Sequence, residues 1–236
     1  MSDIPQPRAA STVVLLRDSA NGLETLLLRR NKALLFAGGF WVFPGGALEP
    51  GDLEAAAGDQ VLASRIAAAR EAEEESGLHP HLEDMVLVSH WTTPVVEPKR
   101  FSTWIYAAPV AVAKDVVIDG GEIHDHLWIG LGEALQRHRR GVLPIMPPTY
   151  VTLCTLASYA SVAELVAEER DSGVPEVLPV FANDNGRITV MFRGDAGYDS
   201  GDPAAAGARH RAVLHDNAWV YSHEGVDAAY PTLVRV

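Results

Sequence analysis

The spacing of apolar residues predicts a β-hairpin and a short strand near the start of the chain. Ser11 to Arg17 and Glu24 to Arg29 are rich in leucine and β-branched residues, as buried strands are. Asn21-Gly22 lies between them and has the composition of a tight hairpin turn. Phe40 to Phe43 predicts a short aromatic strand, which Pro44-Gly45-Gly46 is expected to end.

The middle of the chain mixes helix and strand patterns. Leu62 to Ser76 is rich in alanine and glutamate and precedes Gly77, which predicts a helix with a glycine stop. The other elements expected before residue 170 are strands at Met85–His90, Thr103–Val112 and His126–Ile129, a short helix at Gly132–Arg139 and a long helix at Thr149–Glu169.

The pattern changes after about residue 170, where short apolar runs alternate with turns. Strands are expected at Val177–Phe181, Arg187–Arg193, Ala212–His215 and Ala218–Tyr221, with turns at Asp184-Asn185-Gly186 and Asp216-Asn217. Gly194 to Ala208 is rich in Gly, Ala and Asp and predicts an exposed loop. We therefore expect an α+β domain over residues 8–170 and a β-rich extension over residues 171–236, serving as a dimerisation element or a lid.

Composition narrows the class of protein. Of the 236 residues 47% are hydrophobic and 21% are charged, which is ordinary for a globular chain. The net charge of −12 disfavours broad nucleic-acid binding. The N-terminus has no apolar signal-like core, and Trp104 to Ala113 is too short to span a bilayer, so no membrane partner is expected. With Cys154 as its single cysteine, the chain forms no internal disulfide, and we expect a cytoplasmic protein.

The predicted helix carries a group of carboxylates. Glu71, Glu74 and Glu75 are spaced i, i+3 and i+4, so they share one face. Like charges this close repel one another, and a hard divalent cation would turn the repulsion into ligation, because Mg²⁺ prefers oxygen ligands. A solvated glutamate-rich surface remains the alternative from spacing alone. Upstream, Gly45-Gly46 would let the backbone approach a site closely.

The turn and the helix together resemble the box of the Nudix hydrolase family, G-x5-E-x7-R-E-U-x-E-E-x-G-U, where U is apolar. The matching residues are Gly46, Arg70, Glu71, Ala72, Glu74, Glu75, Gly77 and Leu78, with Asp52 in place of the first glutamate. Residues 53–69 separate Asp52 from Arg70, ten more than the box allows. This insertion falls in the loop before the helix and leaves the carboxylate spacing intact, but the role of Asp52 stays open.

The resemblance implies a fold and a chemistry. The fold would be a Nudix-like α/β/α sandwich with a mixed sheet, and the activity would be hydrolysis of a diphosphate bond with Mg²⁺ or Mn²⁺. The resemblance implies catalytic roles for Arg70, Glu71, Glu74 and Glu122, and metal ligation by Gly46, Glu71, Glu74 and Glu75. Arg70 lies one position before Glu71, so its side chain is not expected simply to face it; in the family this arginine orients the box carboxylates.

The substrate is less well defined. Looser matches, such as Pro98 to Phe101, resemble the branch that contains a peroxisomal coenzyme A diphosphatase, and Leu26 to Arg30 fits part of a coenzyme A signature from which Leu28 and Leu35 depart. Coenzyme A or a derivative therefore leads, while ADP-ribose, dinucleotides and nucleotide sugars remain open. The candidate substrate-binding residues are Arg30, Lys99 and Arg100. A non-catalytic ligand sensor is the alternative function, and a homodimer is possible for either.

Overall fold

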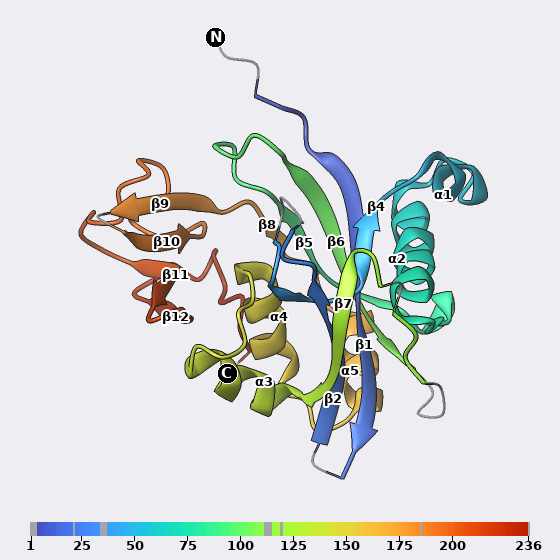
Figure 1. Cartoon of the computed structure of the whole chain (residues 1–236). Coiled ribbons are helices and arrows are strands. Elements are labelled where there is room, and N and C mark those ends of the chain that lie inside the picture. Colours follow the sequence, from blue (N-terminus) through green and yellow to red (C-terminus); the bar gives the residue numbers. More distant parts are fainter. Residues whose placement is uncertain are drawn as a thin grey trace.

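A mixed eight-stranded sheet lies at the centre of the structure, a computed structural model that describes residues 4–20, 22–33, 37–110, 115–118, 120–184 and 186–235. Its strands follow the order β3-β2-β1-β6-β5-β8, and in addition β4 pairs with β1 and β7 pairs with β2 (Figure 1). β1 runs parallel to β6, whereas β1 and β2 are antiparallel. The bounds are β1 (Arg8–Ser19), β2 (Gly22–Arg30), β3 (Trp41–Val42), β4 (Gly45–Ala47), β5 (Val86–Thr92), β6 (Phe101–Pro109), β7 (Ile123–Gly130) and β8 (Glu176–Val177).

Helices cover both faces of this sheet. They are α1 (Pro50–Ala55), α2 (Gln60–Ser76), the 3-10 helix η1 (Leu82–Asp84), α3 (Leu131–Arg139), α4 (Pro147–Leu156) and α5 (Val162–Arg170). Within the described part of the chain, none of the helices is long and apolar enough to cross a membrane. In Figure 1, α1 and α2 lie on one side of the strands, and α3, α4 and α5 lie on the other.

Alternation along β1 divides the core between these two layers. Val13 and Leu15 pack in the cluster that contains the alanines of α2, whereas Val14 and Leu16 pack in the cluster that contains residues of α3, α4 and α5. Because neighbouring residues of a strand point to opposite faces, one continuous apolar strand serves both layers. The expected α/β/α sandwich with a mixed sheet is confirmed.

Helix α2 is positioned by its ends and by small side chains. Asp59 caps its N-terminus by accepting a hydrogen bond from the Leu62 N–H (2.9 Å), and Gly77 ends it with φ +71°. Its buried face consists largely of alanines, including Ala68 and Ala72. Small side chains let the helix axis approach the sheet closely, so α2 lies against β1 and β4.

Two regions differ from expectation. The predicted aromatic strand ends before Pro44, as expected, but Gly45 and Gly46 then form a further strand, β4, because the Val13 N–H donates to the Pro44 carbonyl and the pairing with β1 continues from there. The single long helix expected at Thr149–Glu169 is wrong. The chain forms α4 and α5 instead, and the Ser161 hydroxyl accepts a hydrogen bond from the Glu164 N–H to begin α5.

The hairpin and most of the remaining strands agree with expectation in place, with small differences in length. The single strand expected at Val177–Phe181 is wrong, because Pro179 interrupts it and the chain passes from β8 in the central sheet to β9 (Val180–Asp184) in a second sheet. The hairpin register pairs Leu16 with Thr25, while Asn21 of its turn lies outside the described residues. Strand β7 is longer than predicted and spans Ile123–Gly130. The predicted strand Thr103–Val112 corresponds to β6, and its last two residues lie outside the described residues.

The C-terminal extension forms a second sheet, as the strand pattern predicts. Four antiparallel strands follow the order β12-β11-β10-β9, with bounds β9 (Val180–Asp184), β10 (Arg187–Met191), β11 (Arg209–His215) and β12 (Ala218–Glu224). Asn185 of the predicted turn between β9 and β10 is outside the described residues. In Figure 1 this sheet lies beyond α4, on the far side of the central sheet from α2.

The extension shares the core of the central sheet. Its first strand, β8, pairs in parallel with β5 at the sheet edge. Trp219 on β12 donates its indole N–H to the Ile145 carbonyl (2.9 Å), and its backbone N–H donates to His138 Nε2 (2.8 Å). Phe192 and Trp219 belong to the same apolar cluster as the residues of α4. The extension is therefore packed on the core through buried apolar and hydrogen-bonded contacts.

The segment Gly194 to Ala208 is partly buried, which corrects the expectation of an exposed loop. Asp195 is buried and forms an ion pair with Arg211 on β11, with Nη2 and Oδ1 2.6 Å apart. Asp195 also accepts hydrogen bonds from the N–H groups of Gly197 and His210. Burial alone would raise the pKa of Asp195, but the hydrogen bond from Arg211, together with those from the Gly197 and His210 N–H groups, outweighs it, so the pKa lies below its ordinary value.

We predict that Asp195→Asn destabilises the protein by about 3–5 kcal/mol, because it leaves the Arg211 guanidinium buried without a counter-charge. Since the folded pKa is depressed, the stabilisation by Asp195 is present above its ordinary pKa of 3.8 and is lost as the pH falls through the folded value. Chemical denaturation at neutral and acid pH measures both effects. Asp199→Asn, an exposed neighbour, is the control, and equal stability of the two variants would contradict the prediction.

Candidate active site

Two carboxylates of α2 lie directly against the backbone of β4. The Gly45 N–H donates to Glu75 Oε2 over 3.0 Å. A Cβ placed on Gly46 would lie 2.3 Å from Glu71 Oε1, so the glutamate occupies the space that any side chain at position 46 would need. The φ angle of Gly46 is not in the left-handed region, so backbone conformation does not require glycine there. The close approach of Glu71 does. The structure therefore brings Gly45, Gly46, Glu71 and Glu75 together.

Arg70 links the carboxylates on the exposed side of this group. Its Nη1 donates to Glu71 Oε1 and to Glu74 Oε2, each over 3.0 Å. The expectation that Arg70 would not face Glu71 is wrong, because its long side chain folds back along the helix surface. Its Nη2 also donates to the Ala47 carbonyl of β4 over 3.3 Å. One guanidinium thus holds two glutamates of α2 and the neighbouring strand.

Asp52 anchors this guanidinium from the far end of the insertion. It is 3% exposed and accepts hydrogen bonds from Arg70 Nε (3.2 Å) and Nη2 (3.1 Å). Asp52 also accepts the Glu49 N–H over 2.8 Å and completes a capping box at the start of α1. Residues 53–69 therefore form the end of α1, a turn and the first part of α2, and they return the chain to Arg70.

Burial separates the ionisation of the three glutamates. Burial raises the pKa of Glu75 to about 8; the Gly45 hydrogen bond opposes this shift, and the charge of Glu71 adds to it. Burial also raises the pKa of Glu71, while Arg70 opposes that shift. The Glu74 side chain is 58% exposed. Glu75 is thus a buried carboxyl group with no ion-pair partner among the described residues, and it would be stabilised in its charged form by a cation.

Arg30 and Glu122 lie at the rim of the same site. Arg30 Nη2 and Glu122 Oε2 form an ion pair at 3.1 Å, between the end of β2 and the start of β7. Both charges act on Glu75, since Glu122 raises its pKa and Arg30 lowers it. Two residues distant in sequence, each expected in the site, therefore lie within electrostatic reach of the buried carboxylate.

The other predicted substrate-binding residues lie in the loop between β5 and β6. Arg100 is 9% exposed, and its guanidinium donates to the carbonyls of Thr93 (3.1 Å) and Pro5 (2.9 Å), so it ties the loop to the N-terminal segment. Lys99 places its ammonium 5.4 Å from the centre of the Phe101 ring. The structure gives neither residue a contact with the carboxylates of α2 among the described residues.

The site offers ligands that suit a hard divalent cation. Its donors are carboxylate oxygens and backbone carbonyls, which Mg²⁺ and Mn²⁺ prefer, and the buried Glu75 carboxylate would gain from a cation. Among the described residues, no group of three or more His, Cys, Asp or Glu side chains is already arranged around a single metal position. Arg70 instead forms ion pairs with Glu71 and Glu74, each at 3.0 Å.

Sequence reasoning missed the part that α1 plays. Glu49-Pro50-Gly51-Asp52 is a helix start, with a capping-box pair three residues apart and proline at the first helical position. That signal places Asp52 at the start of a helix, where its side chain is fixed. It does not reveal that Asp52 meets Arg70, because the contact depends on how α1 folds back on α2.

Comparison with known proteins identifies similar chains. A family model described as NUDIX domain matches residues 6–147. A solved NUDIX hydrolase from Alicyclobacillus acidocaldarius is 25% identical with a TM-score of 0.64, over 70% of this chain and 97% of that one. The NUDIX domain of Shewanella oneidensis NrtR, complexed with ADP ribose, is 17% identical with a TM-score of 0.48, over 71% of this chain and 90% of that one. No curated protein matches.

We predict that Gly46→Ala weakens divalent-metal binding by about 10- to 100-fold, as the loss of a supporting contact at a metal site does. The new methyl group would displace the Glu71 carboxylate from β4. Isothermal titration with Mn²⁺ measures the affinity. Gly51→Ala is the matched control, because a Cβ there meets no atom within 4 Å. Equal affinities for the two variants would show that the contact between Gly46 and Glu71 is unimportant.

We also predict that Glu75→Gln stabilises the metal-free protein at alkaline pH. The raised pKa of Glu75 means that its contribution is fully favourable below the ordinary value of 4.5 and is lost as the pH rises through about 8. Glutamine keeps an oxygen for the Gly45 N–H but carries no charge. Thermal melts with a chelator, compared with the exposed control Glu73→Gln, test this. A lower melting temperature for Glu75→Gln above pH 8 contradicts it.

Proposed function

Since the chain belongs to the NUDIX family and is a Nudix-type hydrolase, we propose that it uses Mg²⁺ or Mn²⁺ to cleave a diphosphate bond in a nucleoside diphosphate linked to a second group. The observation that carries this proposal is the placement of Glu71 and Glu75 against Gly45-Gly46. The carboxylates have the spacing of the Nudix box and pack on the two glycines of β4, so they form a site lined by oxygen atoms. A helix with a purely structural role would not require such a site.

Glu71, Glu74 and Glu75 are the proposed metal ligands, and the Gly46 carbonyl adds a backbone oxygen. A divalent cation held there would neutralise phosphate charge and lower the pKa of a bound water, which are the two requirements for attack on an inert diphosphate. The protein contributes the fixed positions of these oxygens. Burial of Glu75 and the contact of Glu71 with Gly46 limit their movement, so they are pre-organised for ligation.

Arg70 is proposed as a positioning residue. It contacts Glu71 and Glu74 and is itself held by Asp52 in a two-point contact, so its guanidinium stays close to the carboxylates. Without a cation it offsets their mutual repulsion. With a cation held by the glutamates, the contacts of Arg70 with Asp52 and the Ala47 carbonyl would keep the exposed face of α2 aligned with β4.

Glu122 is proposed as the group that accepts the proton of the attacking water. Its side chain is 60% exposed and lies within electrostatic reach of Glu75. Arg30 pairs with it at the rim and is the proposed contact for substrate phosphate. An anionic substrate would draw Arg30 away from Glu122, because a diphosphate carries more negative charge than one carboxylate. Substrate binding would then free the Glu122 carboxylate from its ion pair, so that it could act as the base.

Coenzyme A or a derivative is the first substrate to test. One support is that Leu26 to Arg30 fits part of a coenzyme A signature and ends at Arg30, which pairs with Glu122. The other is that the loop between β5 and β6 partly resembles the branch that contains the coenzyme A diphosphatase. In that loop we propose Lys99 as a phosphate contact, and Arg100 as the residue that holds the loop in shape. ADP-ribose, dinucleotides and nucleotide sugars complete the panel, because the carboxylate site itself is compatible with all of them.

The β-rich extension is proposed as a support for the α3–α4 layer. It is joined to that layer through Trp219 and lies across the sheet from α2, a position that disfavours a lid over the carboxylates. A role in forming a homodimer is compatible with this placement. Light scattering on the purified protein tests for the dimer.

We predict that the protein hydrolyses at least one member of this panel with Mg²⁺ or Mn²⁺ and none with a chelator. Glu71→Gln and Glu122→Gln should each lower kcat by about 10²- to 10⁴-fold, the usual contribution of a positioned acid–base group. Product identification by mass spectrometry measures the reaction and shows which bond is cut. Glu73→Gln, on the exposed side of α2, is the control and should retain full activity.

Two results would separate the alternatives. Full activity in the Glu71 variant would refute the assigned site. Tight binding of a panel member, without turnover under any divalent metal, would instead support a ligand sensor.

A further inference from the structure

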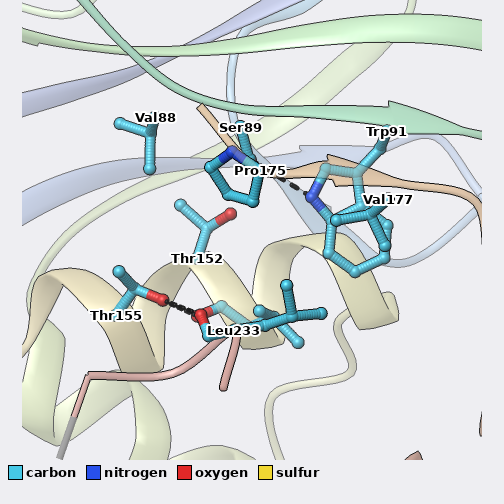
Figure 2. Close-up of a pocket in the computed structure, with 9 residues that line it drawn as sticks. Val88, Ser89, Trp91, Thr152, Thr155, Pro175, Val177 and Leu233 are labelled. Atoms are coloured by element: carbon cyan, nitrogen blue, oxygen red, sulfur yellow. Dashed lines mark hydrogen bonds between the residues drawn. The ribbon is translucent and has the colours of Figure 1, made fainter. Parts of the chain in front are cut away.

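A small cavity lies where the extension meets the core. It has a volume of about 30 Å³ and is bordered by β5, β8, α4 and the C-terminal tail. Figure 2 shows its lining side chains, among which Val88 and Val177 are apolar and three carry hydroxyl groups. Those three are Ser89, Thr152 and Thr155. The cavity therefore combines apolar walls with a few polar groups, at some distance in the fold from the glutamates of α2.

Thr152 has a buried hydroxyl group without a partner. The residue is 2% exposed, and its Oγ1 makes no hydrogen bond among the described residues. Thr155, one turn later on α4, differs, because its Oγ1 contacts the Val151 carbonyl (3.0 Å) and the Leu233 carbonyl (2.7 Å). A buried hydroxyl left unpaired is unfavourable, so most such groups in proteins are satisfied by protein or by ordered water.

Ser89 supplies a complementary group across the cavity. Its Oγ accepts the indole N–H of Trp91 over 3.1 Å, and the dashed line in Figure 2 marks this contact. Among the described residues no acceptor lies within hydrogen-bond distance of the Ser89 hydroxyl hydrogen, so that hydrogen is available to the cavity. Thr155 Oγ1 keeps lone pairs that can accept a hydrogen bond. Three hydroxyl groups therefore border a space in which each can still form a hydrogen bond.

We propose that this cavity is a binding site for ordered water, which joins Thr152 on α4 to Ser89 on β5. The volume of about 30 Å³ exceeds the roughly 10–15 Å³ that one water needs, and it is too small for an organic ligand. A buried water ordinarily makes two to four hydrogen bonds, and the three hydroxyl groups meet that requirement.

The position of this water gives it a structural role. Pro175 and Val177 belong to the segment through which the chain enters the extension, and Leu233 belongs to the segment through which it returns. Both segments line the cavity. The Leu233 carbonyl is also held by Thr155, and the Leu233 N–H donates to the Tyr221 hydroxyl. The water thus completes the junction that attaches the extension to α4 and to the edge of the central sheet.

The test is a crystal structure of the full chain that resolves ordered solvent, together with the melting temperature of Thr152→Val. The structure is expected to show a water peak within hydrogen-bond distance of Thr152 Oγ1 and Ser89 Oγ. Valine has nearly the shape of threonine but cannot bind the water, so the variant is expected to melt about 2–4 °C lower. Thr152→Ser, which keeps the hydroxyl group, is expected to retain the water peak in its own crystal structure.

Two results would overturn the proposal. One is electron density that shows an empty cavity between Ser89 and Thr152. The other is a Thr152→Val protein that melts at a higher temperature than the parent, because an unpaired buried hydroxyl in a dry cavity is unfavourable and its removal stabilises. The diphosphatase assays do not enter this test, so its outcome is independent of the proposed activity.

Discussion

The contact between the glutamates of α2 and the backbone of β4 is the constraint on which the site depends. Glu71 reaches this strand of three residues because Gly46 has no side chain, and Glu75 reaches it by accepting the Gly45 N–H; a side chain at Gly45 would instead collide with Ser11 and Thr12 of β1. The strand itself exists because β1 holds it in register, with Ser11 opposite Gly46. The small residues of α2 then bring the helix close enough for its glutamates to contact the backbone of β4. Sheet pairing, helix packing and site geometry are thus one set of requirements.

Charge balance explains why the cluster is tolerated without a cation. Arg70 supplies one positive charge to Glu71 and Glu74, and Asp52 fixes its orientation from a buried position. Glu75 has no such partner in the part of the chain that the structure describes, and its burial raises the pKa of its carboxyl group to about 8. The negative charge of the helix is therefore reduced in two ways: Arg70 pairs with the glutamates on the exposed side, and burial, with a smaller effect of the Glu71 charge, raises the pKa of Glu75 on the buried side. A cation that enters the site has to compete with both the guanidinium and the proton.

Local patterns predicted much of this arrangement, and long-range contacts account for what they missed. The spacing of Glu71, Glu74 and Glu75 and the hairpin at the start of the chain follow from periodicity, which the structure keeps. Strand β4 was not predicted, because glycine has low strand propensity and only the partner β1 makes it a strand. The break between α4 and α5 was missed because the helix pattern continues through it. The burial of Asp195 depends on Arg211, sixteen residues away, and no local signal shows that contact.

The shared core of the extension has a consequence for how such a chain can be divided. The match to the family model ends at residue 147, and composition changes near residue 170. Either position would therefore be a natural choice for the end of a shortened fragment. A fragment cut there would lose β8 from the sheet edge and expose Trp91, whose ring meets Phe192 edge-on. The newly bared apolar surface would invite aggregation. A fusion partner is therefore better attached before β1, which begins at Arg8, than at a position inside the chain.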